Sequence, residues 1–260
     1  MQLKDFYFDL HTSLITQNPP KNRTDSRLLI KQSSIIDTQF NQIGSFLQSG
    51  DLLIMNNTKV IPARLFGTKT TGGKVEIMIE RLLDEKQALA MIRASRAPKV
   101  GSCIILENGV HVTVQQKNNG FYTLIFETNS LLDLLDNIGH IPLPPYIERA
   151  DNTQDLKSRY QTVYVFQNGA VAAPTAGLYF DDKLLTELKK QGIGYSFVTL
   201  YVGAGTFVPV KTDNIKDHVM HSETFKINQA TIDKINQTKA KWWVHYCSWH
   251  NCCAGFRVQC

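Results

Sequence analysis

The sequence predicts an α/β protein: a larger α/β domain with a mixed, partly parallel sheet, and a small antiparallel β-barrel inserted into it. Residues 67–136 predict the barrel, because short apolar segments alternate there with Gly- or Asn-containing turns at even spacing. Residues 160–202 predict the parallel part, because a strand pattern, a helix pattern and a second strand pattern follow one another as in a βαβ unit. The length of 260 residues allows one large domain or two smaller ones. We expect residues 1–66 and 137–241 to form the main domain.

The first 66 residues predict a loop, a helix and two strands. Arg23 and Arg27 flank a polar turn before an apolar strand, which fits either a surface loop or a loop that faces an anion. Apolar residues four, three and four positions apart predict a helix over residues 35–47, closed by Gly50. Residues 51–55 predict a short buried strand.

The predicted barrel contains five clear strand patterns and one cationic loop. The strand patterns lie at residues 74–79, 88–93, 104–106, 110–114 and 121–126. The loop after the second of them carries Arg93, Arg96 and Lys99. A solvated loop and a contact to a phosphate backbone both fit these three cations.

The chain returns to the main domain through a Pro-rich segment, residues 139–147, whose His140 and Tyr146 could line a pocket or simply fix the angle between domains. A strand over residues 160–166, a helix capped by Asp181 or Asp182 and ended by Gly192, a strand over 195–202 and a helix over 228–241 are predicted in that order.

Two stretches of small residues stand out, at 169–178 (GAVAAPTAGL) and 199–207 (TLYVGAGTF). Small residues let backbone N–H groups approach a ligand closely, although two tight buried turns would have the same composition. The second stretch leads to His218, His221 and Glu223. This cluster fits acid/base chemistry or a structural cap better than a metal site, because no third ligand lies at a useful spacing. Phosphate-loop and dinucleotide fingerprints are absent from the sequence.

Composition places few further limits on function. The net charge of +5 permits an anionic partner such as RNA without requiring one. We expect a cytoplasmic protein without a membrane partner, because no apolar run is long enough to cross a bilayer and the N-terminus lacks the apolar core of a signal peptide. We also expect a monomer.

Several long and unusual blocks resemble the bacterial family of S-adenosylmethionine:tRNA ribosyltransferase-isomerases of queuosine biosynthesis. The matching blocks are residues 26–29, 50–53, 57–67, 72–76, 139–147, 159–164, 169–180, 198–207 and 220–223. The resemblance covers residues 3–241. It implies an α/β domain with an inserted β-barrel. It also implies transfer and isomerisation of the ribosyl part of S-adenosylmethionine onto 7-aminomethyl-7-deazaguanine in the wobble position of tRNA, which gives epoxyqueuosine, adenine and methionine.

The resemblance implies that S-adenosylmethionine is consumed as a substrate, so no cofactor is expected. His221 and Glu223 are the candidates for proton handling. The candidates for substrate binding come from the two small-residue turns, from the Pro-rich segment and from the start of the strand predicted over residues 160–166. They are Thr175, Ala176, Gly177, Gly203, Ala204, Gly205, Thr206, His140 and Tyr160. Arg64, Arg93, Arg96 and Lys99 are the candidates for contact with the anticodon stem-loop. Two departures are visible: Tyr179 and Tyr201 stand where we expect histidine in many members.

The resemblance stops at Lys241, and residues 242–260 read as a tail foreign to the family. One interpretation is a metal-binding tail, because His245, Cys247, His250, Cys252 and Cys253 are all ligand types. The interpretation we favour is a shifted reading frame in a truncated copy. The single tryptophan codon makes Trp242-Trp243-Val244 read Gly-Gly one base later, and the following codons then permit the Gly-Thr-Thr turn of the family. Three functional hypotheses therefore remain: the active enzyme, a truncated, inactive copy, and a non-catalytic tRNA-binding module.

Overall fold

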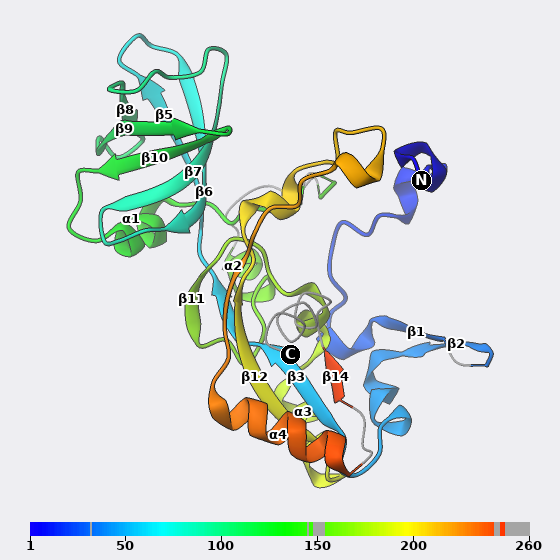
Figure 1. Cartoon of the computed structure of the whole chain (residues 1–260). Helices are drawn as coiled ribbons and strands as arrows, with labels where there is room; N and C mark the ends of the chain where they lie inside the picture. The colour runs from blue at the N-terminus through cyan, green and yellow to red at the C-terminus, as the bar shows by residue number, and fades with distance from the viewer. Residues whose placement is uncertain (32, 145, 148–153, 242–244, 248–260) are drawn as a thin grey trace.

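The computed structural model describes residues 1–31, 33–144, 146–147, 154–241 and 245–247. Figure 1 shows a β-barrel at one end of the molecule and a larger part in which helices flank a mixed sheet. The first residues of the chain lie beside the segment that follows strand β12 (Gly194–Tyr201), where the Leu3 N–H donates to the Asp213 carbonyl at 2.8 Å.

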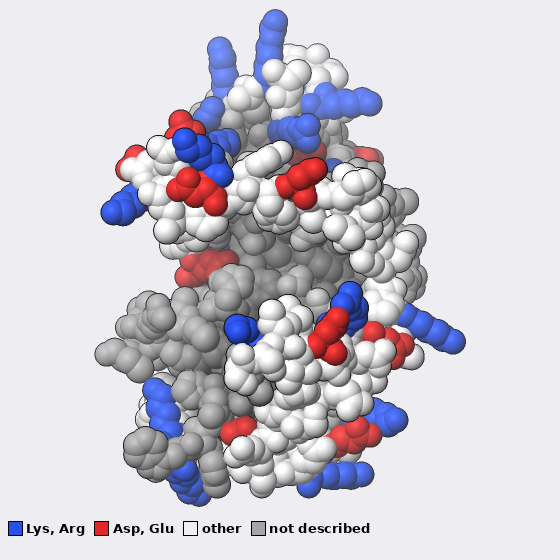
Figure 2. All heavy atoms as spheres, turned by 90° about the vertical axis from the view of Figure 1, so that its right-hand side faces the viewer, with Lys and Arg blue, Asp and Glu red and all other residues white. Residues whose placement is uncertain are grey.

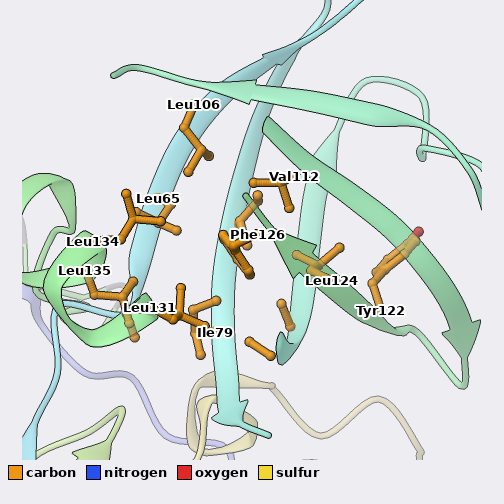
Figure 3. Close-up of a cluster of buried hydrophobic side chains, with 14 of the residues drawn as sticks. Leu65, Ile79, Leu106, Val112, Tyr122, Leu124, Phe126, Leu131, Leu134 and Leu135 are labelled. Atoms are coloured by element: carbon orange, nitrogen blue, oxygen red, sulfur yellow. The ribbon is translucent and has the colours of Figure 1, made fainter. Parts of the chain in front are cut away.

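The barrel is closed, antiparallel and six-stranded. Its strands are β5 (Arg64–Lys69), β6 (Lys74–Leu82), β7 (Gln87–Ala94), β8 (Cys103–Leu106), β9 (His111–Asn118) and β10 (Phe121–Phe126), joined in the order β10-β7-β6-β5-β8-β9. Val75, Ile77 and Ile79 alternate toward the interior, as the period of two in a strand requires. Helix α1 (Leu131–Ile138) packs Leu131 and Leu135 against the same core (Figure 3). The predicted small antiparallel barrel is confirmed.

The main part contains a four-stranded mixed sheet. Its order is β13 (Thr224–Lys226), β12 (Gly194–Tyr201), β3 (Leu52–Asn56) and β14 (His245–Cys247), with β12 and β14 parallel to β3 and β13 antiparallel to β12. Beside it, β11 (Gln167–Ala170) runs parallel to β4 (Thr58–Val60), and β1 (Arg27–Lys31) forms a hairpin with β2 (Ile35–Gln39). The predicted mixed, partly parallel sheet is confirmed.

Helices on both sides of β3 explain why all five of its residues are buried. Leu53 and Met55 share a cluster with the apolar face of α3 (Asp182–Lys190), whereas Leu52 and Ile54 pack with Ile235 of α4 (Gln229–Ala240). Asp181 caps α3 by accepting from the Leu184 N–H at 2.8 Å. The remaining helices are α2 (Gln154–Arg159) and the 3-10 segments η1 (Leu3–Phe6), η2 (Thr12–Leu14), η3 (Arg23–Asp25), η4 (Phe40–Phe46), η5 (Thr175–Tyr179), η6 (Ala204–Phe207) and η7 (Ile215–Asp217).

A buried side-chain amide extends the pairing of β3 with β12 beyond its last backbone pair. The Asn56 Nδ2 donates to the Leu200 carbonyl at 2.9 Å, and the Leu200 N–H donates to Asn56 Oδ1 at 3.1 Å. The Thr58 hydroxyl donates to the same carbonyl at 3.0 Å. Both side chains are inaccessible to solvent, so these bonds satisfy backbone groups that water cannot reach.

Two predicted elements were wrong. Residues 35–39 form strand β2 rather than the first turns of a helix, because they pair with β1; only Phe40–Phe46 is helical, as a 3-10 segment. Residues 160–166 form no strand; the strand before α3 is β11, which begins at Gln167. The spacing of apolar residues was present in both segments, but pairing partners decided the outcome.

The predicted domain boundaries at residues 66/67 and 136/137 stay a prediction; the barrel strands themselves begin at Arg64 and end at Phe126. Residues 242–244 and 248–260 of the foreign tail lie outside the described residues, and with them most ligands of the alternative metal tail. Within the described ranges, no helix is long and apolar enough to cross a membrane.

Gly139, after α1, offers a test of how closely the barrel and main part are joined. A Cβ built there would collide with the backbone oxygens of Pro62 and Leu135, neither of which is the end of a flexible side chain. We expect Gly139→Ala to lower the free energy of unfolding by about 1–3 kcal/mol, the usual range for overpacking. Urea denaturation measures this change. The exposed Asn137→Ala on the same helix is the control; equal stability of the two variants would contradict the packing at Gly139.

Candidate active site

A cavity of about 630 Å³ lies between the barrel and the end of β12. Side chains and turns from both parts of the molecule line it, among them Glu80, Tyr201, Gly203, His221, Glu223 and Lys226. Such a volume is typical of small-molecule sites. The predicted turn at 199–207 and the predicted pair His221 and Glu223 are therefore brought together at one cavity.

The turn after β12 needs glycine because two side chains press against its backbone. A Cβ on Gly203 would overlap the Glu80 carboxylate, and a Cβ on Gly205 would lie 2.5 Å from Cγ of the His221 ring. Neither glycine has a positive φ, since neither is among the residues with that conformation. Close approach, and not unusual backbone geometry, therefore explains both glycines.

His221 and Glu223 lie side by side at the cavity wall. The His221 Nε2 is 3.7 Å from Glu223 Oε1, and both side chains are largely buried. Burial raises the pKa of Glu223 above its ordinary value; His221 lowers it, and the nearby Glu80 carboxylate raises it again. Glu223 therefore keeps its proton to higher pH than an exposed glutamate, which suits a proton donor or acceptor.

Glu80 is a residue of this site that the sequence analysis missed. The Gly205 N–H donates to Glu80 Oε2 at 3.2 Å. Burial raises the pKa of this carboxyl, against the lowering effect of the Ala204 and Gly205 backbone and of His221. In the sequence Glu80 only continues the outward face of a barrel strand, so no local pattern marks it.

The other small-residue turn opens into a second cavity of about 640 Å³. Thr175 and Tyr160 line it together with Arg23 and Tyr179. Burial raises the pKa of Tyr160 to about 12, so its hydroxyl is protonated at neutral pH. The structure therefore places the two turns at different cavities, while Gly169, at the start of the first turn, lines the cavity with His221.

The remaining residues of the two turns vary in exposure. Ala176 is half-buried and Gly177 is buried against the hydroxyl of Tyr164. Ala204 is buried, whereas Thr206 is exposed. The two tyrosines that stand in place of the expected histidines lie at different cavities. Tyr201 lines the cavity with His221, and Tyr179 lines the second cavity.

His140 and Arg64 lie at the junction of the barrel and the main part. Their backbones bond to each other, with the Arg64 N–H donating at 3.1 Å and the His140 N–H at 2.8 Å. The His140 ring meets Phe66 edge-on at 4.9 Å between centroids, and the Arg64 guanidinium bonds Glu76 at 2.8 Å. Neither residue lines the two cavities just described.

Arg93, Arg96 and Lys99 are all exposed, on the end of β7 and the loop that follows. The Lys69 ammonium reaches this loop by donating to the Arg96 carbonyl at 3.0 Å. In Figure 2, Lys and Arg side chains project from the top of the molecule, the end occupied by the barrel in Figure 1. The contact of these three cations with a phosphate backbone stays a prediction.

The described residues contain no group of three or more His, Cys, Asp or Glu side chains placed to hold a metal ion. His218 does not line the cavity with His221 and Glu223. The alternative of a metal site in this cluster therefore has no support in the part of the chain that the structure describes.

Comparison with known proteins places this arrangement in a family. The family model described as "Queuosine biosynthesis protein" matches residues 3–243. The chain belongs to this queuosine biosynthesis family. The matched range contains both cavities and the barrel, and it ends close to Lys241, where the resemblance in the sequence stops.

Two curated relatives carry the same name, S-adenosylmethionine:tRNA ribosyltransferase-isomerase. The protein of Vesicomyosocius okutanii is 76% identical over 240 residues, which are 92% of this chain and 70% of the relative. The protein of Nitrosomonas eutropha is 50% identical over 244 residues, with the same two shares. A solved S-adenosylmethionine tRNA ribosyltransferase from Thermotoga maritima aligns over 94% of this chain and 68% of its own, at 23% identity and a TM-score of 0.40.

The close approach at Gly205 gives a first test of the site in this family member. We expect Gly205→Ala to displace the His221 ring and to reduce turnover at least tenfold with little loss of global stability, because the turn lies at the surface of a cavity. Steady-state kinetics and thermal unfolding measure the two effects. Gly73→Ala is the control, since its Cβ would meet only the flexible Lys69 side chain. Turnover equal to that control would contradict the geometry.

The raised pKa of Glu223 gives a second test, through stability. A carboxyl whose pKa is higher in the folded state contributes stability that is complete below its unfolded pKa near 4.5 and is lost as pH rises through the folded pKa. The glutamine in Glu223→Gln does not ionise, so the variant loses no such stability as pH rises. We therefore expect the stability of this variant relative to the unsubstituted protein to increase from pH 4.5 upward. Urea denaturation across this range measures the difference; the exposed Glu107→Gln is the control, and a difference independent of pH would contradict the burial of Glu223.

Proposed function

We propose that this protein transfers and isomerises the ribosyl moiety of S-adenosylmethionine onto 7-aminomethyl-7-deazaguanine in the wobble position of tRNA. The products are epoxyqueuosine-tRNA, adenine and methionine. S-adenosylmethionine is consumed as a substrate, and no cofactor takes part. The observation that carries this proposal is the 76% identity, over 92% of the chain, to a relative named for this activity.

The cavity beside Gly203 supports the proposal chemically. S-adenosylmethionine has no phosphate, so the absence of a phosphate-binding loop from the sequence is compatible with this substrate. Its sulfonium is a cation, and the cavity presents the carboxyls of Glu80 and Glu223. We assign the reacting part of the donor to this cavity.

Release of adenine requires a proton donor. As the C1′–N9 bond of the ribosyl group breaks, its electron pair passes to the adenine ring, which then takes a proton. Glu223, whose pKa burial raises, keeps that proton to higher pH than an exposed glutamate, and His221 beside it can replace it. We propose that these two residues share the proton handling.

The tRNA is proposed to meet the cations at the barrel end, Arg93, Arg96 and Lys99, while a loop base enters the site. Bases in a single-stranded loop can be splayed out of their stack, which makes the wobble nucleotide accessible. Arg64 is a less direct candidate, because Glu76 already holds its guanidinium. The roles of Thr175, Ala176, Gly177, Thr206, His140 and Tyr160 in binding S-adenosylmethionine stay predictions. So do the cytoplasmic location and the monomeric state.

The direct test is release of adenine. The purified protein is incubated with S-adenosylmethionine and tRNA that carries the deazaguanine precursor, and adenine is measured by chromatography. We expect release that depends on that tRNA and falls about 10²- to 10⁴-fold in Glu223→Gln and His221→Ala. The matched controls are Glu107→Gln and His111→Ala, which are exposed on the barrel and do not line the cavity.

Three other outcomes distinguish the alternatives. Adenine released only by a version with the frame corrected from Trp242 onward would keep the family activity and mark this chain as an inactive copy. Salt-sensitive tRNA binding without turnover in either version would favour a tRNA-binding module. No adenine and no tRNA binding in either version would contradict the proposal.

A further inference from the structure

Among the described residues that line the cavity, Glu80 is the acid that comes from the barrel; it is half-buried and stands at an irregularity of its strand. The pairing of β6 with β7 shifts register between Ile79 and Arg81, so Glu80 is the extra residue of a β-bulge. Bulges redirect a side chain and are common next to active sites. Here Glu80 lies at the bulge on the outward face of β6, and its carboxylate contacts the turn after β12.

We propose that Glu80 is a positioning residue of this site: it holds the turn at Gly203–Gly205 against the barrel and, through its negative charge, sets the pH range in which Glu223 carries a proton. The second half of this inference rests on the proposed function, in which Glu223 handles the proton of adenine. The first half rests on geometry alone.

The contacts of Glu80 bind the barrel to the turn. Its Oε2 accepts from the Gly205 N–H at 3.2 Å, and the Ala204 backbone also bonds to the carboxylate. The absent Cβ of Gly203 leaves the space that the carboxylate occupies. Consecutive backbone N–H groups that converge on one carboxylate form a charge-assisted contact, which is stronger than a neutral hydrogen bond.

The charged groups around Glu80 come from each element packed against it. His221 and Glu223 face it from the segment after the turn, Arg81 follows it on β6, and Lys226 of β13 lines the same cavity, with its ammonium over the Tyr201 ring. Two buried carboxyls that lie near one another disfavour the doubly ionised state. The charge of Glu80 accordingly raises the pKa of Glu223.

The test follows the Glu223 carboxyl directly by NMR. The full chain is labelled with ¹³C at the glutamate carboxyls, and the Glu223 signal is assigned by its loss in Glu223→Gln. We expect Glu80→Gln, which keeps the shape of the side chain but not the charge, to lower the titration midpoint of Glu223 by about one pH unit. Glu80→Asp, which keeps the charge, should restore most of the shift, and Glu107→Gln should cause none.

Reciprocity supplies a second measurement that does not require Glu80→Gln to fold. Because the coupling between two sites is mutual, Glu223→Gln should lower the midpoint of the Glu80 signal by the same amount. The inference would be overturned if, in folded protein, the Glu223 midpoint is unchanged in Glu80→Gln and the Glu80 midpoint is unchanged in Glu223→Gln.

Activity separates this inference from the proposed function. If the unsubstituted protein releases adenine, the limb of its pH–rate profile assigned to Glu223 should move to lower pH in Glu80→Gln; a limb that stays in place would contradict the role of Glu80 in proton handling. If the unsubstituted protein releases no adenine while the NMR midpoints shift, the proposed function fails and the coupling between the two carboxyls stands.

Discussion

The position of the cavity depends on the buried amide of Asn56. The pairing of β3 with β12 ends where Val198 pairs with Asn56. The next backbone groups of β12 therefore have no backbone partner from β3 on that side. The Asn56 side chain replaces it by bonding both the N–H and the carbonyl of Leu200. A buried backbone group left without a partner costs about 1–3 kcal/mol, so these bonds hold the end of β12 on the side that β3 has left, while β13 pairs with it on the other side. Five residues later comes Gly205, which contacts both Glu80 and His221.

The barrel contributes to the same site, so its contacts with the main part affect chemistry as well as stability. Gly139 has no room for a Cβ between Pro62 and Leu135, and the adjacent His140 bonds the backbone of Arg64 at the start of the barrel. Arg64 pairs in turn with Met78 of β6, the strand that carries Glu80 two residues later. A rotation of the barrel would therefore withdraw a carboxylate from the turn.

Local patterns in the sequence predicted elements whose partners are close in the chain. The barrel strands follow their own period of two, and Asp181 and Gly192 mark the ends of α3 by capping. Residues 35–39 and 160–166 were misassigned because their state depends on pairing. The turn at Gly203 and the pair His221 and Glu223 were visible as local motifs. Glu80 was not, since its role comes from a bulge and from contact with a turn more than 120 residues away.

The two carboxyls also determine how the cavity responds to a charged ligand. Burial raises the pKa of both Glu80 and Glu223, so each carboxyl keeps its proton to higher pH than an exposed glutamate does. A sulfonium cation beside them would favour the ionised forms and lower both pKa values. Binding of such a ligand is therefore coupled to proton release, and its affinity increases with pH across the titration of the pair. Because a proton leaves one carboxyl more readily when the other is neutral, the pair can hold one proton and one negative charge together. In the function proposed above, that combination would provide a counter-ion for the sulfonium and an acid for the leaving base in the same small volume.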